Sequence, residues 1–147
     1  MIYLDTNVFI YAYFKPKEIS LTPKVKWMKS EAKNVIEKLN NESEKFCISL
    51  IQLSEVVNIL KMTLMWEDLR RFLLGLISNN SLQIFEISKL LYINSIDKIT
   101  KYNMDSNDIS AYLIMKENNI NQIFTFDKKF RNLKDIECLP KIPDKFK

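Results

Sequence analysis

Histidine does not occur anywhere in the 147 residues of this chain. Its absence excludes Ser-His-Asp and Cys-His nucleophiles, because both need an imidazole as the general base. It also excludes histidine-based acid–base pairs and nearly all structural zinc sites. If the protein is an enzyme, its chemistry must therefore use carboxylates, hydroxyls, lysines or a metal ion held by oxygen ligands.

Glycine, proline and cysteine are scarce as well, with one, four and two residues. So little glycine and proline excludes a linker-rich or low-complexity chain, and 47% hydrophobic residues is a globular composition. Cys47 and Cys138 occur in apolar, strand-like stretches, so we expect buried free thiols. A chain of this length buries roughly 68–70% of its unfolded surface, so we expect one domain over 1–147 that folds without disulfide or metal.

Long apolar runs are also missing. The longest, around 72–77, is far too short to cross a bilayer. No basic segment precedes the strand expected at residue 2, as a signal peptide would require. We therefore expect a cytoplasmic protein with no membrane partner. The net charge of +4 is a small excess that by itself gives only a weak indication of a polyanionic partner.

The apolar periodicity predicts strands that alternate with helices. We expect strands at 2–4, 46–49, 82–87, 122–126 and near 136–139. We expect helices at 8–14, 23–40, 50–63, 66–78, 89–101 and 105–118, with Thr22 and Ser88 as N-caps. This alternation indicates an α/β domain with a mostly parallel sheet.

Acidic residues follow the expected strands. Asp5 interrupts the apolar opening MIYLDTNVFIYAYF where the first strand should end, and Asp127 follows QIFTF. Glu55 lies about one and a half turns into the helix after FCIS, and Asp108 opens the helix before QIFTF, with Asp105 one turn earlier. Ligands of parallel sheets bind outside the carboxyl ends of the strands, so we expect at least four carboxylates around one edge.

The negative charges of such a cluster of carboxylates repel one another, and this repulsion must be offset. Two carboxylates about 4 Å apart repel by roughly 4 kcal/mol at an effective dielectric constant of 20, so the cluster takes up protons or a cation. Oxygen ligands alone favour Mg²⁺ or Mn²⁺ over zinc or copper. Each acid also has an ordinary explanation: Asp5 as a turn or N-cap residue, Glu55 as a solvated helix residue, Asp127 as the start of a turn. Their joint placement favours the metal site.

The same stretches resemble the motifs of the PIN-domain nucleases. IYLDTNVFIYA resembles the opening signature of that family, CISLIQLSEVV the second motif, and DISAYLIMKENNINQIFTFDKKF the third and fourth. The resemblance runs from residue 2 to about 130, and the length is similar to that of stand-alone VapC toxins. It implies a PIN-like three-layer α/β/α domain with a five-stranded parallel sheet, and hydrolysis of RNA phosphodiester bonds with Mg²⁺ or Mn²⁺.

The resemblance also implies roles for individual residues. The catalytic and metal-site acids would be Asp5, Glu55, Asp108 and Asp127. Thr6 and Asn7 would orient Asp5 and a bound water, Thr125 matches a supporting hydroxyl, and Asp105 fits the N-cap of the helix that Asp108 opens. One departure concerns the third-motif helix and the turn after it, where the family has small residues and a glycine and this chain has Tyr112, Met115, Asn118 and Asn119.

The basic residues and the apolar helices predict partners. Setting aside four of the 18 acidic residues leaves 14 against 22 lysines and arginines, which suits contacts to RNA phosphates. Lys128, Lys129 and Arg131 are the candidates, although a lysine-rich solvated surface explains them equally well. The helices at 50–63 and 66–78, with the segment between them, carry more large apolar residues than one core needs, which indicates an interface. The predicted surface consists of Met62, Leu64, Met65, Trp66, Phe72 and Leu74. The resemblance points to a homodimer and to an antitoxin partner.

Two other functions are compatible with parts of this pattern. A catalytically inactive PIN-like scaffold could bind RNA or a protein partner, but such a scaffold need not retain all four acids. A receiver-type or phosphatase-type pocket would place adjacent acids after one strand, and DTN offers only one. The sequence leaves open the RNA target and whether one or two metal ions bind.

Overall fold

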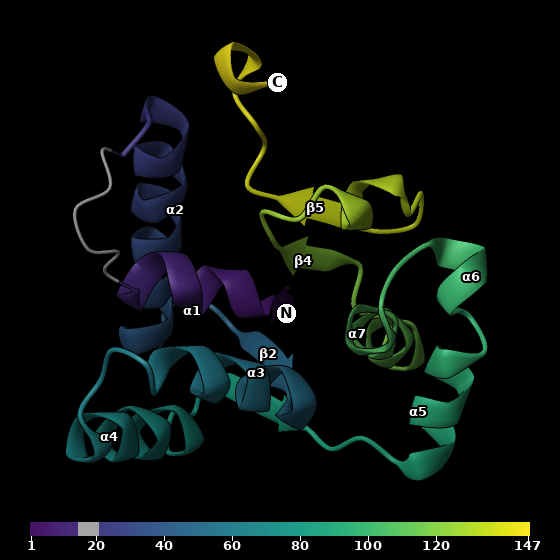
Figure 1. The fold of residues 1–147 in the computed structure, drawn as a ribbon, viewed down its shortest axis with the longest axis horizontal. Helices are drawn as coiled ribbons and strands as arrows, with labels where there is room; N and C mark the ends of the chain where they lie inside the picture. The colour runs from purple at the N-terminus through teal and green to yellow at the C-terminus, as the bar shows by residue number, and fades with distance from the viewer. Residues whose placement is uncertain (15–20) are drawn as a thin grey trace.

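A five-stranded sheet forms the centre of the protein, whose computed structural model describes residues 1–14 and 21–147 (Figure 1). Its strands are β1 (Ile2–Leu4), β2 (Phe46–Ser49), β3 (Leu82–Phe85), β4 (Gln122–Phe124) and β5 (Glu137–Leu139). The strand order is β3-β2-β1-β4-β5, and every neighbouring pair is parallel. The first strand of the chain is therefore the middle strand of the sheet.

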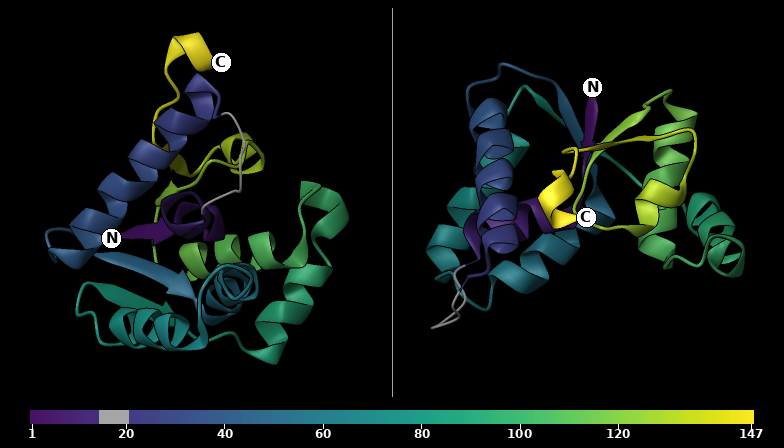
Figure 2. Two further views of the ribbon diagram at one scale, coloured as in Figure 1. Left: turned by 60° about the vertical axis from the view of Figure 1, so that its left-hand side comes forward. Right: turned by 90° about the horizontal axis from the view of Figure 1, so that it is seen from above.

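Helices cover both faces of this sheet. The helices α1 (Thr6–Tyr13), α2 (Pro23–Asn40), α3 (Leu50–Leu60) and α4 (Trp66–Ile77) pack on one face. On the other face lie α5 (Lys89–Ile96), α6 (Ile99–Tyr102) and α7 (Ser106–Glu117), as Figure 2 shows. Side chains alternate between the two cores, so Ile2 and Leu4 belong to the first and Tyr3 to the second. The predicted three-layer α/β/α fold is confirmed.

Several helices begin where the sequence predicts. Thr22 accepts a hydrogen bond from the Val25 backbone at 3.3 Å, and Pro23 occupies the first helical position, whose N–H has no helical partner. The hydroxyl of Ser88 caps α5 by accepting from the Leu91 backbone at 3.1 Å. Both predicted N-caps are confirmed.

Other boundaries differ from the prediction. The helix expected at 89–101 is two helices, because the chain tightens where the Lys98 backbone bonds the Ser95 carbonyl three residues earlier. The helix expected at 50–63 ends at Leu60. The strand expected at 122–126 ends at 124, since the Phe126 backbone N–H bonds the Asn7 side chain.

Short 3₁₀ helices complete the described chain at Lys129–Asn132 and Asp144–Phe146. Both cysteines are free thiols on strands, as expected, but only Cys47 is buried. Cys138 is partly exposed because β5 is an edge strand, so the prediction of two buried thiols is wrong for it. Across 1–14 and 21–147, no helix is long and apolar enough to span a membrane.

Candidate active site

The carboxylate of Asp5 is buried at the carboxyl end of β1, with 5% of the residue exposed. Asp5 occupies the N-cap position of α1, yet its side chain makes no capping bond. Its Oδ2 instead accepts from Asn7 Nδ2 at 2.7 Å and from Thr125 Oγ1 at 2.5 Å. The ordinary N-cap explanation therefore does not account for Asp5.

One further bond joins the segment after β4 to the start of the chain, and another lies within that segment. The Oδ1 of Asn7 accepts from the Phe126 backbone N–H at 3.2 Å. The hydroxyl of Thr125, besides donating to Asp5, accepts from the Asp127 backbone N–H at 2.9 Å. Asn7 and Thr125 thus hold Asp5 against the segment that carries Asp127.

Glu55 is held from two sides. Its Oε2 accepts from Thr6 Oγ1 at 2.9 Å, and its Oε1 accepts from Asn107 Nδ2 at 2.5 Å. Glu55 is half-buried, so the explanation as a solvated helix residue does not apply to it. The hydroxyl of Thr6 therefore orients Glu55, whereas we expected it to orient Asp5.

Asn107 is a site residue that the sequence did not reveal. It precedes Asp108 in the first turn of α7, and no pattern in the sequence distinguishes it from a second capping residue. The hydroxyl of Tyr92 reaches its Oδ1 at 3.5 Å and also bonds Ser106 Oγ at 3.0 Å. Tyr92 and Asn107 therefore connect α5 and α7 to Glu55 on α3.

The remaining acids lie at the ends of α7 and β4. Asp105 is the N-cap of α7, as predicted, because its Oδ1 accepts from the backbone N–H groups of Asn107 at 2.9 Å and Asp108 at 3.0 Å. Asp108 is half-buried in the first turn. The Oδ1 of Asp127 accepts from the Lys129 backbone at 2.9 Å, so Asp127 also closes a turn.

The pKa values show that these carboxylates act on one another. The pKa of Asp5 is raised to about 6, chiefly by burial and also by the charges of Asp127 and Glu55, against the lowering effect of the hydrogen bond from Thr125. The pKa of Asp108 is raised to about 8, first by burial and then by the charges of Asp5, Asp105 and Asp127. The structure thus brings Asp5, Glu55, Asp108 and Asp127 into one electrostatic site.

We tested whether these residues fit a divalent cation. In the described ranges, no three carboxylates or thiols are placed to hold one metal ion as they stand. Their chemistry does fit Mg²⁺ or Mn²⁺, because all donors are oxygen atoms. Burial first, and then the neighbouring acids, disfavour the charged forms of Asp5 and Asp108, and a cation would favour them.

The raised pKa values predict that the metal-free protein loses stability as the pH rises. Both carboxyls ordinarily titrate near 3.8 but hold their protons more tightly when folded. Their contribution to stability is complete below about pH 3.8 and is lost as the pH rises through about 6 for Asp5 and about 8 for Asp108. In EDTA, we expect a lower Tm above about pH 8 than below about pH 6. An Asp5→Asn, Asp108→Asn double variant should lose this dependence, and an equal dependence in that variant would contradict the assignment.

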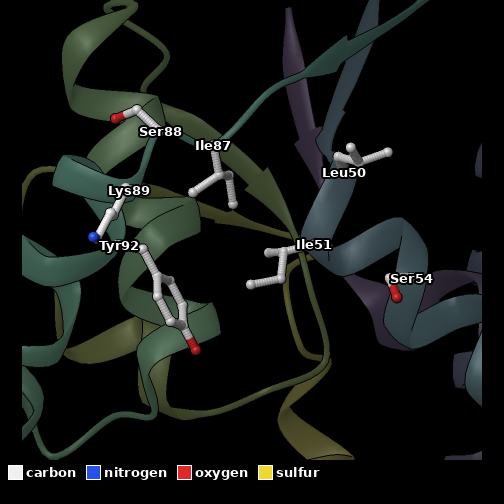
Figure 3. A pocket seen from close by; sticks show the side chains of 7 residues that line it. All are labelled: Leu50, Ile51, Ser54, Ile87, Ser88, Lys89 and Tyr92. Carbon is white, nitrogen blue, oxygen red and sulfur yellow. The ribbon is translucent and has the colours of Figure 1, made fainter.

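A cavity of about 590 Å³ lies between α3 and α5 (Figure 3). Side chains from α3 line one side and side chains from α5 and the loop before it the other: Leu50, Ile51 and Ser54 opposite Ile87, Ser88, Lys89 and Tyr92. Tyr92 lines this cavity and also contacts Asn107, the partner of Glu55. The cavity is therefore connected to the acidic site through two side chains.

The basic residues after Asp127 differ in their surroundings. Lys128 and Lys129 are exposed at the start of the 3₁₀ turn. Arg131 instead donates from Nη2 to the Pro140 carbonyl at 3.1 Å, and its Nε is buried. Arg131 is thus directed at the end of β5, so we do not propose it as an RNA contact.

Comparisons with known proteins identify the family. The family model of the PIN domain matches residues 2–136. No curated protein matches the chain. Among solved structures, VapC20 of Mycobacterium tuberculosis, a toxin that cleaves the sarcin–ricin loop, is similar with a TM-score of 0.67 and 12% identity, covering 91% of this chain and 95% of that one.

Two toxin–antitoxin structures are similar as well. A complex from Klebsiella pneumoniae gives a TM-score of 0.63 at 18% identity, covering 93% of this chain and 96% of that one. VapBC2 of Rickettsia felis, bound to a DNA fragment from its promoter, gives 0.61 at 21% identity, covering 94% and 97%. These likenesses show the fold, and the family match over nearly the whole length shows that the chain belongs to the PIN-domain family.

Proposed function

We propose that this protein is a divalent-metal-dependent endoribonuclease and the toxin of a VapBC-type toxin–antitoxin pair. The observation that carries the proposal is that Glu55 and Asp127, from distant parts of the chain, lie close enough for their charges to act on the buried carboxylate of Asp5, whose charge acts in turn on Asp108. Three hydrogen bonds hold this arrangement. They join pairs of residues that are 49, 52 and 120 positions apart in the sequence. Membership of the PIN-domain family and the likeness to VapC structures support it.

Asp5, Glu55, Asp108 and Asp127 would hold the cation. A bound Mg²⁺ or Mn²⁺ supplies an activated water and neutralises charge on the leaving oxygen of a phosphodiester. The chain itself supplies position: Asn7 and Thr125 fix Asp5, and Thr6 and Asn107 fix Glu55. By holding the cation in one place, these fixed carboxylates would position the attacking water relative to the phosphate, and such positioning is a large part of the catalytic effect.

The direct test is cleavage of a labelled RNA by the purified protein. We expect cleavage with Mn²⁺ and none with excess EDTA. Cleavage that persists in EDTA would contradict metal dependence. RNA binding without cleavage in Mn²⁺ would favour the inactive scaffold.

The antitoxin part of the proposal is supported by the likeness to structures described as toxin–antitoxin complexes. A small open reading frame directly upstream of the gene is the expected genomic arrangement. Co-expression of its product should then abolish RNA cleavage by this protein. Undiminished cleavage in the presence of that product would contradict the toxin–antitoxin role and leave the nuclease proposal unaffected.

A homodimer is the expected assembly, through the apolar surface around α4. Met62, Met65 and Trp66 are about three-quarters exposed, at 76%, 75% and 75%, and Leu74 is also exposed. Two other residues of the predicted surface, Leu64 and Phe72, pack against the core instead. A group of large apolar side chains left in water marks an interface.

We expect light scattering at micromolar concentration to give a dimer mass for the native protein and a monomer mass for Trp66→Glu. Leu90→Glu is the matched control, because Leu90 is comparably exposed, at 69%, on the opposite side of the sheet. A native monomer would contradict the dimer. Dissociation by Leu90→Glu alone would move the interface to α5.

A further inference from the structure

A second cavity, of about 320 Å³, shares no lining residue with the first. Its lining includes three lysines and two tyrosines: Lys101, Lys129, Lys134, Tyr102 and Tyr112. The segments that contribute them are α6, α7 and the chain from η1 (Lys129–Asn132) to Asp135. A concave surface lined by converging cations is suited to an anion.

The charges of this cavity are positive on balance. Asp135 is the one carboxylate among the lining residues, and it pairs with Lys116 at 2.5 Å and accepts from the Tyr112 hydroxyl at 3.1 Å. Its charge is thus already compensated from outside the lining. The ammonium of Lys101 lies 5.2 Å from the centre of the Tyr102 ring. That contact favours a position of the Lys101 ammonium next to the cavity.

Two connections place the cavity beside the acidic site. Tyr112 follows Asp108 by four residues on α7, so the two side chains lie on the same face of the helix, about 6 Å apart along its axis. On the other side, the Lys129 backbone donates to Asp127 Oδ1 at 2.9 Å. One strand of RNA can therefore contact both places.

We infer that this cavity binds a backbone phosphate of the RNA substrate, next to the bond that is cleaved. The inference rests on the proposed nuclease function. The four acids repel the flanking phosphates of a substrate, whereas the lysines attract them, so the cavity sets where the strand lies relative to the acids. The volume is at the lower end of the roughly 300–1,000 Å³ of ligand pockets, which suits one nucleotide unit of a longer chain.

The test measures binding of a fluorescent single-stranded RNA to the full chain in excess EDTA, where no cleavage is expected. The pocket variant is Lys101→Gln, Lys134→Gln, which leaves Lys129 and its contact with Asp127 intact. The control is Lys26→Gln, Lys33→Gln, two exposed lysines of α2 on the opposite face of the sheet. Both variants have the same net charge, and equal thermal unfolding checks that both fold.

We expect the pocket variant to weaken RNA binding severalfold more than the control. Its salt dependence, the slope of log K against log salt, should fall by up to about 0.7, because the cavity holds one phosphate and each neutralised phosphate of a single strand contributes about 0.7. Inorganic phosphate at constant ionic strength should displace no more RNA than chloride does. Equal effects in the two variants would overturn the subsite, and so would displacement by inorganic phosphate, which would make free phosphate the ligand.

The nuclease proposal is checked separately by cleavage in Mn²⁺. A native protein that fails to cleave RNA, but binds it through Lys101 and Lys134, would contradict the nuclease proposal and support the phosphate site. If the native protein cleaves RNA, and the pocket variant binds and cleaves RNA as the control does, the phosphate site is contradicted and the nuclease proposal is supported.

Discussion

Replacing Asp5 by asparagine is expected to abolish metal-dependent RNA cleavage, with a loss of two to three orders of magnitude or more. The amide keeps the shape of the carboxylate, so its oxygen can take the place of the carboxylate Oδ2 and accept from Asn7 and Thr125. It removes the charge at the centre of the acidic site, where the pKa of Asp5 is already raised by burial and by Asp127. Because the like charges then repel less, the metal-free variant should unfold at the same or a higher temperature.

The measurement is turnover of a labelled RNA in Mn²⁺, with circular dichroism and thermal unfolding as the check on folding. Asp97→Asn is the matched control, since Asp97 is an exposed aspartate at the end of α5. It should cleave at the native rate. A folded Asp5→Asn protein with undiminished cleavage would show that the chemistry does not depend on this carboxylate.

The second large effect should separate Asp108 from Asp105. Asp108 is half-buried and lies in the field of Asp5 and Asp127, so Asp108→Ala should remove cleavage and weaken Mn²⁺ binding. Asp105 is exposed and caps α7 with its side chain. Asp105→Ala should therefore lower the free energy of unfolding by about 0.5–2 kcal/mol, the usual cost of a lost N-cap, and affect cleavage less.

Isothermal titration with Mn²⁺, together with RNA turnover, distinguishes the two variants. Since Asp105 contributes to the raised pKa of Asp108, a modest effect of Asp105→Ala on Mn²⁺ affinity is consistent with the assignment. An inactive Asp105→Ala with an active Asp108→Ala would mean that the third motif is shifted by one helical turn.

The sequence predicted the fold and the edge of the sheet where the acids meet, because both follow from local patterns. A short apolar run followed by a polar residue marks a buried strand end, and Thr22-Pro23 marks a helix start. Those signals fix which residues are near the carboxyl ends of the strands. They are sufficient to place Asp5 and Asp127 on the same side of a parallel sheet.

The hydrogen-bond partners within the site could not be predicted in the same way. Whether the Thr6 hydroxyl bonds Asp5 or Glu55 depends on how α3 packs against α1, which no periodicity encodes. The bond between Asn107 and Glu55 joins helices on opposite faces of the sheet, 52 residues apart. The same holds for the exposed surface, where Phe72 packs inward on α4 and Leu74 does not.

The central position of β1 has a consequence for the order of synthesis. Thr125, the hydroxyl donor to Asp5, is translated 120 residues after it. At about 5–20 residues per second, the ribosome needs roughly ten seconds to cover that distance. Throughout this interval the nascent chain holds Asp5 without Thr125 or Asp127, and β1 lacks its neighbour β4. For the proposed nuclease, this order keeps Asp5 apart from Asp127 during synthesis, while the growing chain is still attached to the ribosome, which is itself rich in RNA.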